Sequence, residues 1–181
     1  MNLLNAFSLL ETLTEGKEDY QEKYKQYIIG HKQRVKQFAD WLKENLPEVF
    51  EGVNVNAFDA QIAEHDNTKY SEEEFDAYAR HFYNDEDYSP EYDDAWVHHW
   101  MNNEHHPEHW GGDDMPYIYI LEMLCDWGSF SIASGDFHEL IDYYYQDAKD
   151  DDEKDLSPKT KKTIERILSK VKAVIEGGDR K

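Results

Sequence analysis

Residues 62–70 read IAEHDNTKY and place a histidine directly before an aspartate at the end of an apolar segment. Residues 55–64 have helical periodicity, so His65 and Asp66 are expected where a helix ends. Imidazole and carboxylate groups are ligands of Mn, Fe, Co, Ni and Zn. The pair is therefore either the centre of a metal site or two polar residues at a helix terminus, and we adopt the first interpretation.

The segments around this pair also have helical patterns, and strand patterns are nearly absent. In residues 20–46, apolar and aromatic side chains recur at steps of three and four, and Pro47 ends the segment. Ser71 and Glu74 have the spacing of a capping box, which predicts a helix from there to about residue 83. Further helices are expected over residues 3–13, 92–104, 116–127, 137–148 and 158–176. The sequence predicts an all-α fold, a helical bundle of six or seven helices.

Composition suggests how the chain divides. A polar break at residues 14–19 separates residues 1–16, an expected N-terminal extension with a short helix, from a helical domain over residues 17–148. Residues 149–157 are strongly acidic and are predicted to be a solvated linker. Residues 158–181 are then expected to form a C-terminal helix that packs on the same domain.

The charge and the apolar pattern exclude several classes of partner. The formal net charge of -21 at pH 7 repels a phosphate backbone, so polymeric nucleic acid is not expected as a ligand. The N-terminal segment lacks a basic region, and no apolar run approaches the roughly 20 residues of a membrane span. The single cysteine, Cys125, fits a reducing compartment. We expect a cytoplasmic protein without membrane association, and leave self-association as a homo-oligomer open.

The histidines are unevenly distributed. Seven of the nine lie between residues 65 and 109, and another, His31, lies in the middle of the first long predicted helix. Asp126 lies in the apolar segment YILEMLCDWG, where a buried carboxylate is costly unless something pairs with it. A metal ion would supply that pairing. The chain thus offers His31, the pair His65-Asp66 and Asp126 from three separate helices.

The order of these residues resembles the H…HD…D signature of the HD-domain superfamily of metal-dependent phosphohydrolases. Three longer blocks resemble a largely phage-encoded HD-like family without an established activity: EHDNTKYSEEEFDAYARHFY, AWVHHWMNNEHHPEHW and MPYIYILEMLCDW. The resemblance covers roughly residues 28–130 and implies an HD-domain-like helical bundle, located in the host cytoplasm if the chain is phage-encoded. It implies that His31, His65, Asp66 and Asp126 hold a divalent metal.

A second group of histidines decides between one ion and two. If the helix over residues 92–104 continues, His99 and Asn103 share a face and His106 follows one turn later. Two-metal HD proteins add histidines from this region, so His99 with His105 or His106 is the candidate second ligand set. Otherwise these histidines orient ligands or contact a substrate phosphate. The expected cofactor is one or two ions of Mn, Fe, Co, Ni or Zn per chain.

The leading hypothesis is hydrolysis of a small phosphorylated molecule, with a nucleotide as the first candidate. Asp66 is expected to manage the proton, and Glu72 and Glu122 are further candidates for that role. Lys69 and Arg34 are expected to bind the phosphate and to offset the charge that develops on it. Further candidates for binding the substrate are His99, Asn103, His106 and Trp96.

Two alternatives stay open. A di-iron oxygenase on the same scaffold needs His99 and His105 or His106 as ligands, and it would consume oxygen without releasing phosphate. A non-enzymatic acidic phage protein would instead bind a basic host partner. Its activity would be indifferent to Asp66→Ala and sensitive to salt.

Overall fold

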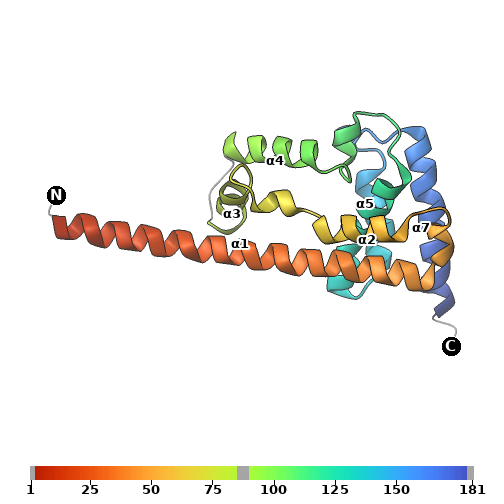
Figure 1. Cartoon of the computed structure of the whole chain (residues 1–181), viewed down its shortest axis with the longest axis horizontal. Coiled ribbons are helices and arrows are strands. Elements are labelled where there is room, and N and C mark those ends of the chain that lie inside the picture. Colours follow the sequence, from red (N-terminus) through yellow and green to blue (C-terminus); the bar gives the residue numbers. More distant parts are fainter. Residues whose placement is uncertain (1–2, 85–89, 179–181) are drawn as a thin grey trace. The chain divides into compact units, whose positions relative to one another are not determined.

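The structure, a computed structural model, describes residues 3–84 and 90–178 (Figure 1). Within these residues the chain is all-helical, with seven α-helices and no strand, which confirms the predicted fold class. The α-helices are α1 (Leu3–Asn45), α2 (Val55–Glu64), α3 (Phe75–Tyr83), α4 (Pro90–Asn102), α5 (Tyr117–Ser134), α6 (His138–Tyr143) and α7 (Pro158–Gly178). Single turns of other helix types are η1 (Pro47–Phe50), η2 (Asn67–Tyr70), η3 (Pro107–Trp110) and η4 (Tyr144–Ala148). None of the helices described is long and apolar enough to cross a membrane.

The chain forms two compact units. The first unit comprises Met1–Gly30 and Asn67–His99, and the second comprises His31–Asp66 and Trp100–Lys181. Helices α1 and α4 each contribute residues to both units. The predicted division into an extension, a helical domain, a linker and a C-terminal helix stays a prediction.

Two predicted helix boundaries differ from those of the structure. Helix α1 runs without interruption through residues 14–19, so the expected polar break is wrong. Three of these six residues are glutamate or lysine, which are good helix formers, and Gly16 alone costs only about 1 kcal/mol, which does not end a helix. Helix α3 begins at Phe75 rather than at Ser71, and Glu74 makes no side-chain cap. The Glu74 carboxylate is instead fully buried and bonded to two histidines.

The core of the first unit is aromatic. Tyr24 of α1 packs its ring against Phe75 and Tyr78, with ring centroids 5.5 and 6.1 Å away. Gln21 of α1 donates a hydrogen bond to Asp76 of α3 at 2.8 Å. The buried members of this cluster are Tyr20, Tyr24, Ile28, Ala77, Tyr78, Ala79 and Ala95. The tyrosines at four-residue spacing in α1 therefore serve the core, as their periodicity indicated.

Helix α5 is the central element of the second unit, where it contacts α2, α6 and α7. Gly128 of α5 permits a close approach to α1. A Cβ atom built on Gly128 would lie 2.5 Å from carbons of the Phe38 ring, and that ring is fully buried. His31 precedes Phe38 by about two turns of α1, and it lies beside Asp126 and Ser129 of α5. The helix packing that Gly128 permits is thus the packing that forms the candidate site.

We predict that Gly128→Ala lowers the free energy of unfolding by about 1–2 kcal/mol. Overpacking costs about 1–3 kcal/mol, which exceeds the roughly 0.5–1 kcal/mol that alanine gains over glycine within a helix. Urea denaturation measures the change. The matched control is Gly177→Ala in α7, where an added Cβ meets nothing within 4 Å and no loss is expected. Equal effects of the two substitutions would mean that the Phe38 ring moves aside without cost.

Candidate metal centre

Three helices of the second unit supply four ligand-type side chains. His31 comes from the middle of α1, and Asp126 comes from the middle of α5, not from a helix end as expected. His65 is the C-cap residue of α2. Asp66 follows with φ 58°, a left-handed conformation that is uncommon outside glycine and is best tolerated by Asn and Asp. This turn allows two successive side chains to reach the same point, as predicted for the end of a helix.

The four side chains converge on a small volume. The Nε2 atom of His31 lies 3.0 Å from Asp126 Oδ1, 3.3 Å from Asp66 Oδ2 and 3.4 Å from His65 Nε2. His65 Nε2 in turn lies 3.4 Å from Asp66 Oδ2 and 3.6 Å from Asp126 Oδ1. Three of these side chains are almost completely buried, whereas that of Asp126 is 17% exposed. Asp126 is therefore the most exposed of the four side chains.

These separations suit a bound metal ion. Two ligand atoms that share an ion at about 2.0–2.2 Å lie about 2.8–3.1 Å apart at right-angle geometry and about 3.3–3.6 Å apart at tetrahedral geometry. The five distances above fall within these two ranges, from 3.0 to 3.6 Å. Two imidazoles and two carboxylates are a donor set suited to Mn, Fe, Co, Ni or Zn. The buried His/Asp cluster is therefore a candidate metal site.

Both histidines of the cluster are oriented through their other ring nitrogen. His31 Nδ1 lies 3.3 Å from the hydroxyl of Ser129, and His65 Nδ1 lies 2.9 Å from Glu122 Oε1. Donation from each Nδ1 leaves the lone pair on Nε2, the atom that faces the cluster. Gln61 donates a hydrogen bond to Oε2 of Glu122 and so fixes the carboxylate. These contacts support a positioning role for Glu122, and its proposed role in proton transfer stays a prediction.

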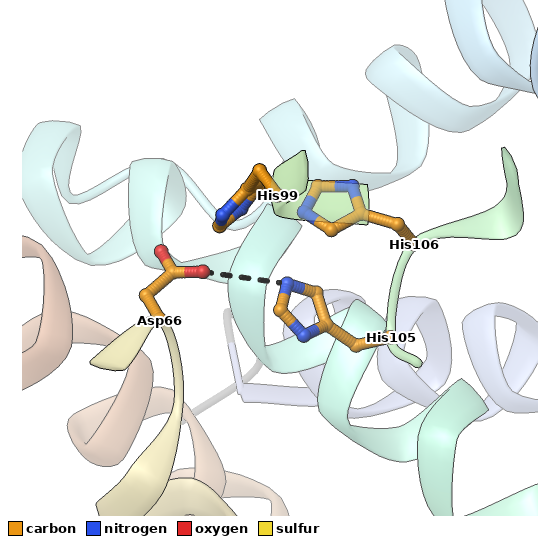
Figure 2. A group of neighbouring side chains, drawn as sticks. All are labelled: Asp66, His99, His105 and His106. Carbon is orange, nitrogen blue, oxygen red and sulfur yellow. Dashed lines mark ion pairs between the residues drawn. The ribbon is translucent and has the colours of Figure 1, made fainter. Parts of the chain in front are cut away.

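Asp66 also faces a second group of histidines. Its Oδ1 atom lies 3.6 Å from Nε2 of His105, the pair joined by the dashed line in Figure 2. Ligand-type atoms of Asp66, His105 and His106 lie within 4.8 Å of one another. His105 and His106 come from the loop after α4, because that helix ends at Asn102 and does not persist to His106. Asp66 therefore presents one oxygen to each group.

The pKa values show how the cluster is balanced without an ion. Burial opposes the charged form of His65, but the charge of Asp66 and hydrogen bonds to Asp126 and Glu122 raise its pKa to about 10. The pKa of His31 is also raised, because Asp126 and Asp66 outweigh the effect of burial. Burial would raise the pKa of Glu122, but hydrogen bonds from His105 and His65 lower it to about 2. The proton on His65 thus helps to compensate the carboxylates, the raised pKa of His31 acts in the same direction, and a bound ion would take over this role.

Two basic residues of α1 lie close to His31 in sequence. Lys32 is half-buried, and burial lowers its pKa while the charges of Asp66 and Glu64 oppose the shift. Lys32 was not singled out from the sequence, where it reads as one more lysine of a polar helix face. Arg34, expected to bind phosphate, is half-buried, and its Nε atom has no hydrogen-bond partner among the described residues.

Several sequence candidates belong to the first unit. His99 (also labelled in Figure 2) is buried, with Nδ1 2.8 Å from Oε2 of Glu74, while His98 Nδ1 lies 2.7 Å from Oε1 of the same carboxylate. Thr68 adds a contact to His99 Nδ1 at 3.2 Å. The sequence does not mark Glu74 as a group that orients His98 and His99, because its spacing from Ser71 is that of a capping box.

The remaining candidates divide between the units. In the first, Lys69 in η2 and Trp96 in α4 are half-buried, and Glu72 is exposed in the turn before α3. In the second, Asn103 is buried and its carbonyl accepts a hydrogen bond from the His106 amide at 3.1 Å. The roles predicted for these four residues stay predictions.

Comparison with known proteins identifies the family. A family model described as a family of unknown function, DUF5662, matches residues 20–170. The chain belongs to this family. No curated protein and no solved structure matches the chain. The DUF5662 match contains every residue of the buried cluster and its orienting partners, and the family as such carries no activity to assign.

We predict that metal affinity rises with pH. With a pKa of about 10, His65 binds a proton in the metal-free protein at neutral pH, and the raised pKa of His31 favours its protonated form in the same direction, so a metal must compete with protons. The apparent affinity should rise about tenfold per pH unit for each displaced proton, up to about pH 10 for His65. Competition with a chromophoric chelator between about pH 6 and pH 9 measures this. An affinity that does not change with pH would contradict the protonated histidines.

We further predict that Ser129→Ala weakens metal binding about 10- to 100-fold, the usual effect of losing a partner that orients a ligand. Ser131→Ala is the matched control, since Ser131 is equally buried on the same helix and its hydroxyl has no hydrogen-bond partner among the described residues. Metal titrations of both variants measure the difference. Equal affinities would exclude an orienting role for the Ser129 hydroxyl.

Proposed function

We propose that this DUF5662 chain is a metal-dependent phosphohydrolase that acts on a small phosphorylated molecule, and that a nucleotide is the substrate to test first. The observation that carries the proposal is the convergence of His31, His65, Asp66 and Asp126 with donor separations of 3.0 to 3.6 Å. Their order along the chain resembles the H…HD…D signature of the HD-domain superfamily. The helical fold is compatible with that resemblance.

An ion held by these four residues would supply Lewis-acid polarisation of the phosphoryl group and would acidify the attacking water. The chain's own residues do the rest. Ser129 and Glu122 fix the imidazole rings, so the site needs little rearrangement when it is loaded. The partly exposed edge at Asp126 gives the substrate and water their access. Lys32 places a cation near the Asp66 side of the cluster, where it can offset charge that develops on phosphate.

The role of Asp66 depends on the number of ions. With one ion, Asp66 would help to hold it, and the Oδ1 atom on the His105 side would be available as a proton acceptor. With two ions, Asp66, His105 and His106 would hold the second. That arrangement suits hydrolysis between two ions, and with iron it suits oxygen chemistry. The di-iron oxygenase is therefore the second candidate function, favoured by the two-sided contacts of Asp66.

The net charge of the chain limits the range of candidate substrates. A net charge of -21 disfavours long polyanions, because repulsion accumulates with every phosphate that approaches the surface. A small phosphate ester presents only one or a few such groups. A bound divalent ion reverses the local field at the site itself. Among phosphorylated substrates, small molecules are thus admitted more readily than polymers.

We predict that the chain purified without added metal or chelator contains a divalent transition metal and releases phosphate from a member of a nucleotide panel. Asp126→Asn should lower both, with phosphate release falling on the order of 100-fold or more, since loss of an orienting partner alone costs 10- to 100-fold. Metal content by mass spectrometry and phosphate release by colorimetry measure the two effects.

The matched control is Asp142→Asn, which removes an exposed carboxylate of α6 and should change neither readout. Two irons per chain with oxygen uptake and no phosphate release would favour the oxygenase. A protein that neither contains metal nor takes it up on titration would overturn both candidate functions.

A further inference from the structure

The acidic segment 149–157, expected to be a solvated linker, is held in a defined turn. Asp151 accepts hydrogen bonds from the Glu153 amide at 2.9 Å and from Lys154 Nζ at 2.8 Å. Asp155 has φ 40°, a left-handed conformation, and its amide bonds to the Asp151 carbonyl at 3.2 Å. A non-glycine residue keeps such a conformation only where the surrounding structure enforces it.

The turn is fastened to the loop before α5. A Cβ on Gly112 would lie 2.6 Å from a carboxylate oxygen of Asp155, so the two residues are closely packed. Ser157, which is buried, donates a hydrogen bond to Asp114 at 2.7 Å. Thr160 at the start of α7 accepts a hydrogen bond from the Met115 amide at 3.1 Å. The segment therefore presents the Lys154 side chain in one direction rather than leaving it in solvent.

Lys154 is linked to the histidines of the candidate site through the carboxylate of Glu108. Its ammonium group lies 4.0 Å from Oε1 of Glu108, and the other oxygen of that carboxylate lies 3.8 Å from Nδ1 of His106. Both Lys154 and Glu108 have side chains that are largely buried, with 21% and 12% exposure. A chain of contacts thus leads from Lys154 through Glu108 to His106, whose ring packs 4.4 Å from that of His105.

Tyr143 lies within electrostatic range of both Lys154 and Asp126. Tyr143 interacts electrostatically with Lys154, Asp126 and Glu108, and burial raises the pKa of its hydroxyl, which stays a hydrogen-bond donor at neutral pH. The Tyr143 ring packs against Trp127, the residue next to Asp126, with centroids 5.2 Å apart. Lys154 is thus connected to both Asp126 and His106, on two sides of the candidate site.

We propose that Lys154 is the anion-binding residue of this site and that its ammonium group receives the phosphate of the substrate. The inference rests on the proposed function and adds a named phosphate-binding residue to it. The neighbouring carboxylates, Asp126, Glu122 and Glu108, would repel a phosphate dianion, and the ammonium group offsets that repulsion. Asp151 and Glu108 keep the ammonium group charged, and a phosphate would bind it in competition with these two carboxylates.

The test measures binding of inorganic phosphate to the Mn²⁺-loaded protein, by paramagnetic broadening of the ³¹P signal. Lys154→Gln should weaken phosphate binding about 10-fold or more, the effect of losing a hydrogen bond to a charged group. Lys154→Arg should restore most of the affinity. Asp151→Asn is the matched control, because it removes the same hydrogen bond from the turn but keeps the ammonium group. Its phosphate affinity should equal or exceed that of the parent protein.

The outcomes separate this inference from the function on which it rests. If the parent protein binds Mn²⁺ but no phosphate, the phosphohydrolase proposal fails and the role of Lys154 fails with it. If the parent binds phosphate and Lys154→Gln binds it equally well, only the inference fails. A loss in Asp151→Asn as large as in Lys154→Gln, or a loss of Mn²⁺ from Lys154→Gln, would assign Lys154 to the structure of the turn and overturn the inference.

Discussion

The negative charges of three carboxylates in the interior of the second unit have to be compensated by neighbouring groups. The packing of the helices around them provides these groups. Asp66, Glu122 and Asp126 lie among apolar helices, where an isolated charge is strongly unfavourable. Each one faces at least one histidine at hydrogen-bond or ion-pair distance. The imidazoles can meet the requirement in two ways, by holding protons or by sharing an ion with the carboxylates. The same side chains therefore account for the order of the metal-free core and for its capacity to bind a cation.

Close helix packing makes this compensation possible. His31 reaches Asp126 and Ser129 only because α1 and α5 approach closely, and Gly128 removes the atom that would keep them apart. On the other side, α2 ends one residue before His65, and the left-handed turn at Asp66 brings a second carboxylate to the same point. Neither helix packing nor turn geometry is chemically special by itself. Their combination places the Nε2 atoms of His31 and His65 within 3.0 to 3.6 Å of carboxylate oxygens of both Asp66 and Asp126.

The sequence predicted those features that depend on local pattern. Periodicity predicted the all-helical fold class. The residues that precede His65 and Asp66 predicted that this pair lies at the end of an apolar helix. Prediction from local pattern failed where a residue has two possible hydrogen-bond partners. Glu74 satisfied the spacing of a cap, but it binds His98 and His99, because burial made the histidines its better partners.

Residues whose role depends on distant segments carried no signal in the sequence. Ser129 and Gln61 are ordinary polar residues until α1, α2 and α5 are packed together. Lys154 read as part of a solvated acidic run, since nothing local shows that Asp155 packs against Gly112, some forty residues earlier. Local pattern thus identified the ligand-type residues, and tertiary packing selected the groups that orient them.

The backbone conformation of Asp66 has a consequence for the fraction of the protein that is folded. A left-handed aspartate beside buried histidines is a conformation that the chain tolerates rather than favours. On the proposed assignment, an ion that binds only the folded chain shifts the folding equilibrium toward it, in proportion to the free metal concentration. Newly made chains would then accumulate when metal is plentiful and be degraded when it is scarce. The amount of this protein in a cell would report metal supply without any dedicated regulator.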